Sequence, residues 1–472
     1  MAAYLLSVSH LRRMGLVIPV FVVWMLVFSL IVPFPNITFP PSSVPQPLLD
    51  MMVVGAQDIS SPWNRTYGGS LSDGGYSLVE VSSGGFACTG YTMSSGAGAQ
   101  DIWLVRSGVD GLAQWSQTYG GTDSDWGRSV LEVSGGGFAI AGETFSFGNG
   151  SLDVWLLRTT SDGTLLWNKT YGGVFSDSAT AMVWVSTGGF AITGSTANFG
   201  ASSTDIWLLR TDADGNHLWN RTYGGGSLDE GYSVVEVSTG GFAIAGYTNS
   251  YGAGSSDAWL VRTDANGNLL WSRTYGGSGW DQGFSLVELS TGGFAIAGYT
   301  YSFGAGDSDV WLLRTASDGT LLWNKTYGGA AIEYGMSVLE ASPGAITIAA
   351  YTASFGAGAF DVWVLRTDLD GTLLWNQTFG GTGEDRAMEI IRVSSGGFAI
   401  LGDTSSFDAG GGDFWLLRVT EPGPFIPGPG PFPIDPLFLA LVIVIIVIVI
   451  VVIVALRRRS GKSQPRKRKS KK

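Results

Sequence analysis

The chain has very little of the chemistry that most catalytic sites require. Among its 472 residues there is one cysteine, Cys88, and there are two histidines, His10 and His217. A single cysteine excludes an internal disulfide, so packing must hold the chain together. No Cys–His pair, phosphate-binding loop or nucleophile motif accompanies the histidines. The sequence therefore predicts that the protein is not an enzyme and carries no cofactor.

Charged residues are also few, at 14% of the chain, and they are unevenly distributed. All 39 acidic residues lie between Asp50 and Asp435, where only fifteen of the 27 basic residues are found. A strongly negative surface repels phosphate backbones and other anionic polymers. The central part of the chain is therefore not expected to bind nucleic acid.

The sequence does contain seven copies of one repeat. The Trp of a W-x-x-T-[YF]-G-G motif recurs every 52 residues from Trp63 to Trp375, with no insertion or deletion. A D-x-W-[LV]-[LV]-R motif recurs with the same spacing from Asp101 to Asp413. A fixed period of this length with several short strands per copy is typical of a β-propeller. The sequence predicts an all-β fold with seven blades.

One copy shows the expected strands. Alternation of apolar and polar residues predicts a first strand over 231–238, and residues 242–248, 258–263 and 269–275 form three more. Gly-rich turns separate them, and an Asn-Gly pair at 266–267 is a hairpin signal because both residues tolerate positive φ. The first recognisable element of the array, Trp63–Tyr67, is a lone fourth strand, whereas the last copy ends on a third strand. We therefore expect the N-terminal strand to complete the last blade and to close the ring.

Each end of the chain contains a long apolar run, and the repeat array between them contains none. Residues 14–34 follow Arg12 and Arg13 and read as a secretory signal peptide or an uncleaved signal-anchor. Residues 437–456 are twenty uncharged apolar residues, long enough to span a bilayer, and ten Lys and Arg follow them. Positive residues stay in the cytoplasm, so the C-terminus is expected inside and the propeller outside.

These features predict six segments. In chain order they are a signal peptide or signal-anchor (1–34), a linker (35–59), the seven-bladed propeller (60–420), a Pro/Gly stalk (421–436), a transmembrane helix (437–456) and a basic cytoplasmic tail (457–472).

At its W-N-x-T-[YF]-G-G and G-G-F-A-I-A-G-Y-T motifs the chain resembles the secreted β-propeller repeat proteins of archaea and bacteria. Its blade plan is similar to that of kelch-type blades, with a glycine-bounded second strand and a Trp in the fourth. The resemblance covers about residues 60–420 and implies a surface-exposed propeller on a membrane anchor. It implies no activity, because propellers host many functions.

A first candidate site is a ring of carboxylates just before each first strand, where they could encircle one mouth of the channel and attract a cation such as calcium or a basic partner. The alternative, which the residue type favours, is that each carboxylate bonds its own loop. The seven residues are Asp73, Asp125, Asp177, Asp229, Asp281, Glu333 and Asp385.

A second candidate is a set of loop aromatics expected on the same face, suited to stacking on sugars or, alternatively, to filling gaps between blades. Six are repeated: Phe147, Phe199, Tyr251, Phe303, Phe355 and Phe407. Trp126, Trp280 and Tyr334 break the repeat, as do Trp184 and Arg392 at a position that is otherwise Glu. Departures from a repeat are where specific function is expected.

Seven Asn-x-Ser/Thr sequons predict possible N-glycosylation, although the repeat consensus alone would also produce five of them. They are Asn36, Asn64, Asn149, Asn168, Asn220, Asn324 and Asn376. Together the sequence favours a cell-surface binding or adhesion module for a glycan, a peptide or an envelope partner. A polysaccharide-acting enzyme using a carboxylate pair, and a purely structural envelope protein, are the alternatives.

Overall fold

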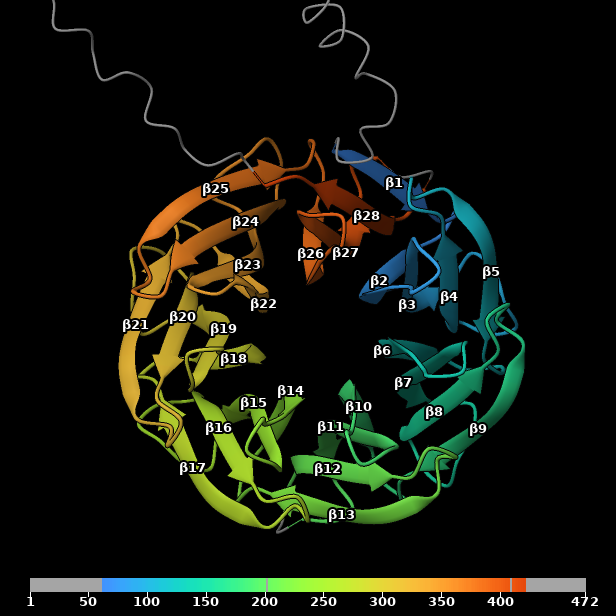
Figure 1. Ribbon diagram of the computed structural model, residues 1–472, viewed down its shortest axis with the longest axis horizontal. Helices are drawn as coiled ribbons and strands as arrows, with labels where there is room; N and C mark the ends of the chain where they lie inside the picture. The colour runs from blue at the N-terminus through green and yellow to red at the C-terminus, as the bar shows by residue number, and fades with distance from the viewer. Residues whose placement is uncertain (1–61, 201–202, 408–409, 422–472) are drawn as a thin grey trace, which may run out of the picture. The chain divides into compact units, whose positions relative to one another are not determined.

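The computed structural model describes residues 62–200, 203–407 and 410–421, and within these ranges every helix or strand is a β-strand. The strands form seven four-stranded antiparallel sheets. Figure 1 shows these sheets arranged as blades around a central axis. The predicted all-β, seven-bladed propeller is therefore confirmed.

The blades are numbered by their innermost strand, which opens with the repeated carboxylate. In order, blades 1 to 7 begin with β2 (Asp73–Glu80), β6 (Asp125–Glu132), β10 (Asp177–Trp184), β14 (Asp229–Glu236), β18 (Asp281–Glu288), β22 (Glu333–Ser342) and β26 (Asp385–Arg392). The second strands are β3 (Phe86–Thr92), β7 (Phe138–Thr144), β11 (Phe190–Thr196), β15 (Phe242–Thr248), β19 (Phe294–Thr300), β23 (Ala345–Thr352) and β27 (Phe398–Thr404).

The third and fourth strands complete each blade toward the outside of the ring. The third strands are β4 (Asp101–Ser107), β8 (Asp153–Thr159), β12 (Asp205–Thr211), β16 (Asp257–Thr263), β20 (Asp309–Thr315), β24 (Asp361–Asp368) and β28 (Asp413–Val419). The fourth strands are β5 (Ala113–Tyr119), β9 (Leu165–Tyr171), β13 (His217–Tyr223), β17 (Leu269–Tyr275), β21 (Leu321–Tyr327), β25 (Leu373–Phe379) and, for blade 7, β1 (Trp63–Tyr67).

One predicted strand differs from the structure. The first strand of blade 4 was expected over 231–238, but β14 runs from Asp229 to Glu236. Asp229 already pairs with Thr248 of β15, which extends the strand at its start. At its end, the amide of Val237 bonds the carbonyl of Gly241 at 2.9 Å, so the turn to β15 begins two residues earlier than alternation alone suggested.

The ring closes as the sequence predicted. β1 pairs antiparallel with β28, from Trp63 opposite Arg418 to Tyr67 opposite Phe414. Figure 1 shows the start of the array beside its end, within blade 7. Closure covers the outer edge of β28, which would otherwise be left open to pair with another chain.

Apolar contacts between blades form the core. Each buried cluster joins two neighbouring blades; that between blades 2 and 3 contains Val154 and Leu156 on one side and Phe190 and Trp207 on the other. All four side chains are at most 3% exposed. Removing such apolar surface from water is the main force that holds adjacent blades together.

The repeated Tyr of W-x-x-T-Y-G-G ties each blade to the next. Its hydroxyl donates a hydrogen bond to a glycine carbonyl in the hairpin between the third and fourth strands of the following blade, as in Tyr275 to Gly319 at 2.6 Å. Six tyrosines make this bond. The seventh copy has Phe379, which faces blade 7. That blade has no such hairpin, because its third and fourth strands come from opposite ends of the array.

A second bond between blades explains the repeated Glu at the end of the first strand. Glu288 accepts hydrogen bonds from both the amide and the hydroxyl of Ser238 in the preceding blade, each at 2.7 Å. Five of the seven junctions contain this pair. Trp184 and Arg392 replace the Glu at the other two. Trp184 packs edge-on against Phe190 with 5.1 Å between ring centroids, so there the substitution adds packing in place of the bond.

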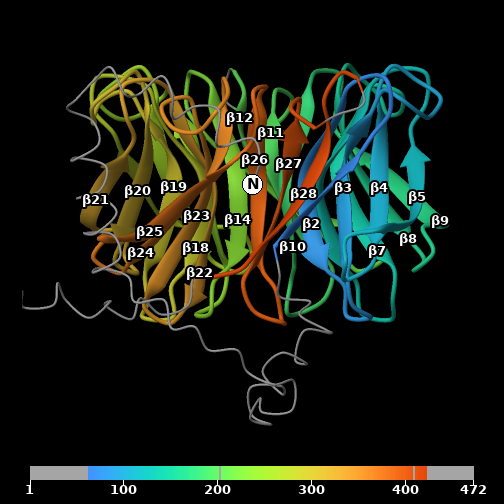
Figure 2. The ribbon, with the colours of Figure 1, turned by 90° about the horizontal axis from the view of Figure 1, so that it is seen from above.

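Figure 2 shows the inner strands running nearly along the channel, with loops gathered at the two ends of the ring. One end carries the connections from each fourth strand to the next first strand and those from second to third strands; we call it the 4–1 face. Within the described ranges no helix is long and apolar enough to cross a membrane. The predicted signal and transmembrane segments, 14–34 and 437–456, lie outside those ranges.

Candidate functional site

The seven carboxylates of the predicted ring lie at the 4–1 face, and all are at most 1% exposed. Asp73 is representative: its Oδ2 accepts the amide of Gly69 at 2.9 Å and the hydroxyl of Ser94 at 2.8 Å, and its Oδ1 accepts the amide of Met93 at 3.1 Å. Glu333 likewise accepts the amide of Gly329 at 2.8 Å, and its Oε1 accepts the hydroxyl of Thr352 and the amide of Ser354. These are the contacts of the loop-bonding alternative. A buried carboxylate that already accepts several hydrogen bonds is poorly placed to attract a passing ion.

The six repeated aromatics lie beside these loops, since Ser146, next to Phe147, bonds Asp125 at 2.7 Å. Their rings, however, rest on the Trp of the third strand of the same blade: Phe147 on Trp155 at 5.0 Å and Phe199 on Trp207 at 5.5 Å between centroids. The other four pairs are built alike. The rings remain 42–49% exposed. They face the outer wall rather than the carboxylates.

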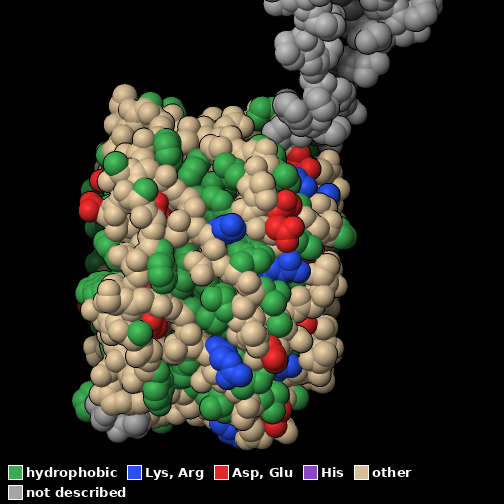
Figure 3. Space-filling view, turned by 90° about the vertical axis from the view of Figure 1, so that its left-hand side faces the viewer, with side chains coloured by type: hydrophobic (Ala, Val, Ile, Leu, Met, Phe, Trp, Pro, Cys, Tyr) green, Lys and Arg blue, Asp and Glu red, His purple; other side chains and the backbone are tan. Residues whose placement is uncertain are grey.

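These aromatic pairs border shallow grooves between neighbouring blades on the outer wall. The groove between blades 3 and 4 has a volume of about 580 Å³ and is lined by Tyr251, Trp259, Arg221 and Asn268. Grooves of about 420 and 340 Å³ occupy the same place at two other junctions. Figure 3 shows the outer wall on the side of blades 5 and 6, where hydrophobic side chains are scattered among uncharged polar groups and a few charged ones.

The two Trp residues that break the repeat occupy different surroundings. Trp126 is half-buried on β6, where Arg128 lies 5.7 Å from its ring centroid and Phe145 packs edge-on at 5.7 Å. Trp280 lies in the loop before β18 and is 57% exposed. Trp126 therefore packs beside Arg128 on an innermost strand, whereas Trp280 lies at the surface.

Of the described sequon residues, five are exposed: Asn64, Asn149, Asn168, Asn324 and Asn376; Asn220 is half-buried. Asn36 lies outside the described residues. Asn168, Asn324 and Asn376 also accept a hydrogen bond from the indole of a third-strand Trp, at 3.1–3.3 Å. This contact gives the repeated Asn a structural role, and its amide nitrogen remains on the outer wall.

The feature that sequence reasoning missed is a bulge in every first strand. In all seven blades the pairing of the first and second strands skips one residue, between Gly75 and Ser77 in blade 1. A bulge re-aims the side chain of the extra residue. The skipped residues are Tyr76, Arg128, Thr180, Tyr232, Phe284, Met336 and Met388.

All seven bulge residues line one cavity of about 620 Å³ at the centre of the ring. Leu152, Ser176 and Thr204, from loops of the 4–1 face, line it as well, so the cavity lies toward that face. We call it the channel mouth. Its seven bulge residues are all half-buried, as expected for side chains around a narrow opening.

Blades 1 to 3 make the polar side of the channel mouth. Arg128 donates to Glu143 at 3.0 Å and lies 4.4 Å above the ring centroid of Tyr76. Burial raises the pKa of Glu143, and Arg128 acts in the opposite direction. In blade 3 the hydroxyls of Ser178 and Ser195 are 2.7 Å apart. This side therefore offers one ion pair and several hydroxyls.

Blades 4 and 5 make an aromatic side of the channel mouth through Tyr232 and Phe284, and blades 6 and 7 add Met336 and Met388. Tyr232 packs edge-on against Phe284 at 5.0 Å, and Phe284 contacts Tyr299 at 5.4 Å. Tyr299 contacts Tyr334 at 4.5 Å, and Tyr334 contacts Tyr351 at 5.3 Å. These three rings extend the aromatic contacts beyond the residues that line the cavity. Tyr334, singled out by its departure from the repeat, is thus part of a continuous arc. Burial raises the pKa of these tyrosines, so they stay neutral and serve as rings and hydroxyl donors.

The signal for this site was present in the sequence. Aligning the seven copies at their 52-residue period puts Tyr, Arg, Thr, Tyr, Phe, Met and Met in one column, whereas the column before it contains only Gly and Ala. Small residues are required there because the next strand or blade is close: a Cβ on Gly75 would lie 3.0 Å from the Gly402 carbonyl. The varied column, free of that constraint, faces open space.

Among the described residues, no group of three His, Cys, Asp or Glu side chains could hold a metal ion. The channel mouth contains Glu143 and Glu230, and the residues that line it include no histidine or cysteine. The side chains that it offers are rings, hydroxyls and charged groups.

No protein-family model matches the chain. Over 226 residues it is 27% identical to the "Regulatory protein FlaEY" of Caulobacter vibrioides, which covers 43% of this chain. The chain spans only 22% of the length of that relative.

Two solved structures are similar in their chain trace. The WD40 domain of Pan2 from Neurospora crassa is 10% identical, with 75% of this chain and 90% of that one covered and a TM-score of 0.45. A Bacteroides caccae protein of unknown function is 12% identical, with 62% and 94% covered and a TM-score of 0.39. By its own strands, the chain is a seven-bladed β-propeller.

Proposed function

We propose that this protein is a non-catalytic binding module, held at the cell surface, that takes its ligand at the channel mouth. The observation that supports this most directly is the variation of the seven bulge residues around one cavity. A residue that serves the fold recurs in most copies, as the inter-blade Tyr does in six of the seven and the inter-blade Glu in five. Seven side chains that share a position but differ in chemistry are suited to contact something that lacks sevenfold symmetry.

The composition of the channel mouth fits recognition of a polar ligand with apolar faces. Its rings provide stacking surfaces, and its hydroxyls and carboxylates provide directional hydrogen bonds. A glycan, a peptide segment or a side chain of an envelope protein fits this description. At about 620 Å³ the cavity also has the volume of an ordinary small-ligand site.

Attachment to the membrane is supported by the sequence of the C-terminal segment. Twenty uncharged apolar residues at 437–456, the basic tail and the Pro/Gly stalk before them suit a single span with a spacer. The propeller would then face outward, within reach of envelope glycans and proteins. An uncleaved N-terminal segment would add a second span.

The test is to block the channel mouth in the full-length chain. Met388→Trp adds a large ring at a half-buried bulge position. Leu374→Trp on the outer wall, where Leu374 is 55% exposed, is the matched control. Purified full-length protein, wild type and both variants, is applied to arrays of glycans and of envelope-derived peptides. We expect Met388→Trp to weaken binding at least tenfold while Leu374→Trp binds as wild type does.

Two other outcomes would contradict this proposal in different ways. Binding that survives Met388→Trp but is lost in Tyr251→Ala would place the ligand in the grooves of the outer wall. Release of products from a polysaccharide substrate would point to the enzymatic alternative. Thermal unfolding of each variant is measured alongside, so that lost binding is not confused with lost fold.

A further inference from the structure

The channel mouth is lined by more acidic than basic side chains, and this restricts the class of ligand that it can bind. We propose that the ligand presents a positively charged amine or guanidinium group, which binds between Glu230, Tyr232 and Phe284. This inference rests on the proposed function of the channel mouth as a binding site. It adds the class of ligand group that the site recognises.

The three residues are held together on adjacent blades. Glu230 and Tyr232 lie on β14, and Phe284 is the bulge residue of β18. The Tyr232 hydroxyl donates to Glu230 Oε2 at 3.0 Å, which orients the carboxylate. The Tyr232 and Phe284 rings meet edge to face, with an interplanar angle of 86°. All three side chains line the cavity, so a carboxylate and two rings converge on one space.

The charges around that space favour a cation. Among the described residues that line the cavity, Arg128 is the one base, against two acids, Glu143 and Glu230. Arg128 is already engaged by Glu143 and by the Tyr76 ring. Glu230 acts to raise the pKa of Glu143, so the two carboxylates repel each other across the opening. A cation bound beside Glu230 relieves that repulsion.

Ring faces strengthen the same preference, because the π-system of Tyr or Phe attracts a cation within about 6 Å. Arg128 over Tyr76 shows that this channel already holds one cation in that way. The net charge of the propeller acts in the same direction, since its acids far outnumber its bases and steer cations toward it.

The repeat does not conserve an acidic residue at the position of Glu230. The equivalent residues of the other six copies are Gly74, Trp126, Ser178, Gln282, Tyr334 and Arg386. None of them is acidic. Loop bonding and blade contacts therefore do not require a carboxylate at this position, and a role in contacting a ligand accounts for it.

The probes are capped five-residue peptides that differ only in their central residue. The series contains Lys, Nε-trimethyl-Lys, Nε-acetyl-Lys and Glu, and glucosamine with N-acetylglucosamine gives the same comparison on a sugar. Binding to the full-length protein is measured by isothermal titration calorimetry. We expect the Lys and trimethyl-Lys peptides to bind at least tenfold more tightly than the acetylated and Glu peptides.

Variants assign the effect to the site. Glu230→Gln is expected to weaken binding of the Lys peptide about tenfold, and Phe284→Ala is expected to weaken the trimethyl-Lys peptide more than the Lys peptide. Asp214→Asn removes the same charge from the exposed hairpin turn between β12 and β13, at the end of the ring opposite the 4–1 face, and serves as the matched control. We expect it to leave binding unchanged.

The outcomes separate this inference from the proposed function. Equal affinity for charged and acetylated probes, or no binding of either cationic probe, overturns the cation site. If Met388→Trp still abolishes binding of a neutral array ligand in that case, the channel mouth remains the binding site. If Met388→Trp and Glu230→Gln both leave all binding unchanged, the two proposals fail together.

Discussion

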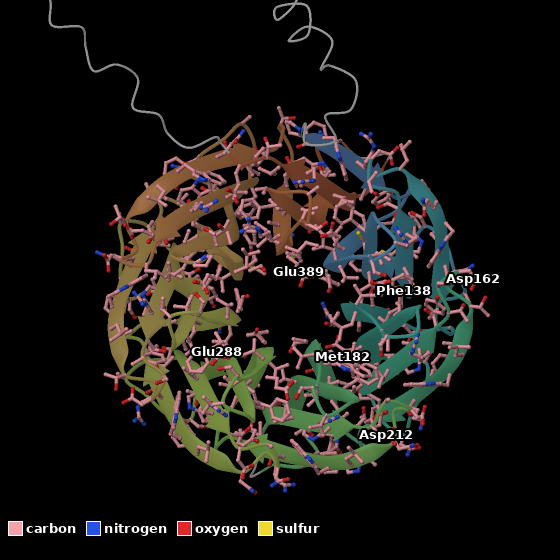
Figure 4. All side chains as sticks on the ribbon, viewed as in Figure 1. Phe138, Asp162, Met182, Asp212, Glu288 and Glu389 are labelled. Atoms are coloured by element: carbon pink, nitrogen blue, oxygen red, sulfur yellow. The ribbon has the colours of Figure 1, made fainter. Side chains whose placement is uncertain are left out.

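Glu389 shows how one residue can make the ring sensitive to pH. Five blades have serine at this position in the first strand, and the serine hydroxyl accepts an amide of the next blade, as Ser77 does from Val130 at 3.1 Å. In blade 7 the acceptor is Glu389, which takes the amide of Leu78 at 2.6 Å across the junction with blade 1. Figure 4 shows Glu389 at the inner edge of the ring, far from Asp162 and Asp212 at the outer rim.

Burial raises the pKa of Glu389 from 4.5 to about 7. The folded state therefore holds this proton more tightly than the unfolded state does, and stability falls as pH rises from about 4.5 to about 7. We expect Glu389→Gln to flatten this dependence and to be more stable than wild type at pH 8, by on the order of 1–2 kcal/mol. Urea unfolding of both proteins at pH 5 and pH 8 checks it; equal differences at the two pH values would contradict it.

The tyrosine that links successive blades provides a second prediction. Tyr275→Phe removes the donor to the Gly319 carbonyl and should lower the free energy of unfolding by about 1–2 kcal/mol. Phe379→Tyr adds a hydroxyl where blade 7 has no hairpin carbonyl to accept it, so no matching gain is expected. Thermal and urea unfolding of the two variants test this; equal and opposite effects would mean that the hydroxyl acts through something other than the hairpin.

At the scale of the element, the junctions between blades are unequal. The junction of blades 7 and 1 has the Tyr67–Gly111 bond, the Ser394–Glu80 pair and the Glu389 contact. The junction of blades 6 and 7 has neither the Tyr bond nor the Ser–Glu pair, because Phe379 and Arg392 replace them. The Ser337–Ile390 bond at 3.3 Å and the ion pair of Arg366 with Glu421 at 2.8 Å remain there. The junction of blades 7 and 1, which joins the two ends of the array, thus keeps all three kinds of bond, whereas the junction of blades 6 and 7 lacks two of them.

Strand β1 is the element on which closure depends. Deleting Trp63–Tyr67 from the full-length chain removes its pairing with β28 and exposes the edge of that strand. We expect the melting temperature to fall by about 10 °C or more and the protein to self-associate, because the exposed edge can pair with another chain. Asn64→Gln, which changes an exposed side chain and keeps the strand, should leave both unchanged. A deletion variant that stays monomeric with unchanged melting would show that β1 is dispensable.

At the scale of the whole molecule, orientation decides what the channel mouth can meet. If residues 437–456 span the membrane with the basic tail inside, protease added to intact cells should digest the propeller and spare an epitope placed after Lys472. Replacing the ten Lys and Arg of the tail by Gln should weaken this orientation. The measurement is immunoblotting of both ends before and after permeabilisation. Protection of the propeller in intact cells would contradict an extracellular site.

The repeat by itself determined the fold class, the number of blades and the closing strand. A period of 52 residues with four strand patterns leaves few ways to bury the apolar residues, and the offset between the first and last motifs requires closure by the N-terminal strand. From the sequence we also favoured the interpretation that Asp73 and its equivalents accept hydrogen bonds from their own loops, because Asp in Gly-rich turns commonly bonds nearby backbone.

Only the tertiary structure decided which side chains meet in space. The sequence predicted that Phe147 and its equivalents share a face with the carboxylates, but stacking on the third-strand Trp turns their rings to the outer wall. The bulges at Tyr76 and its equivalents direct seven residues of five types into one cavity, and a bulge depends on strand pairing that no single copy reveals. Glu230 and Phe284 are 54 residues apart in the sequence. They line the same cavity only because the neighbouring blade places the Phe284 ring near the carboxylate.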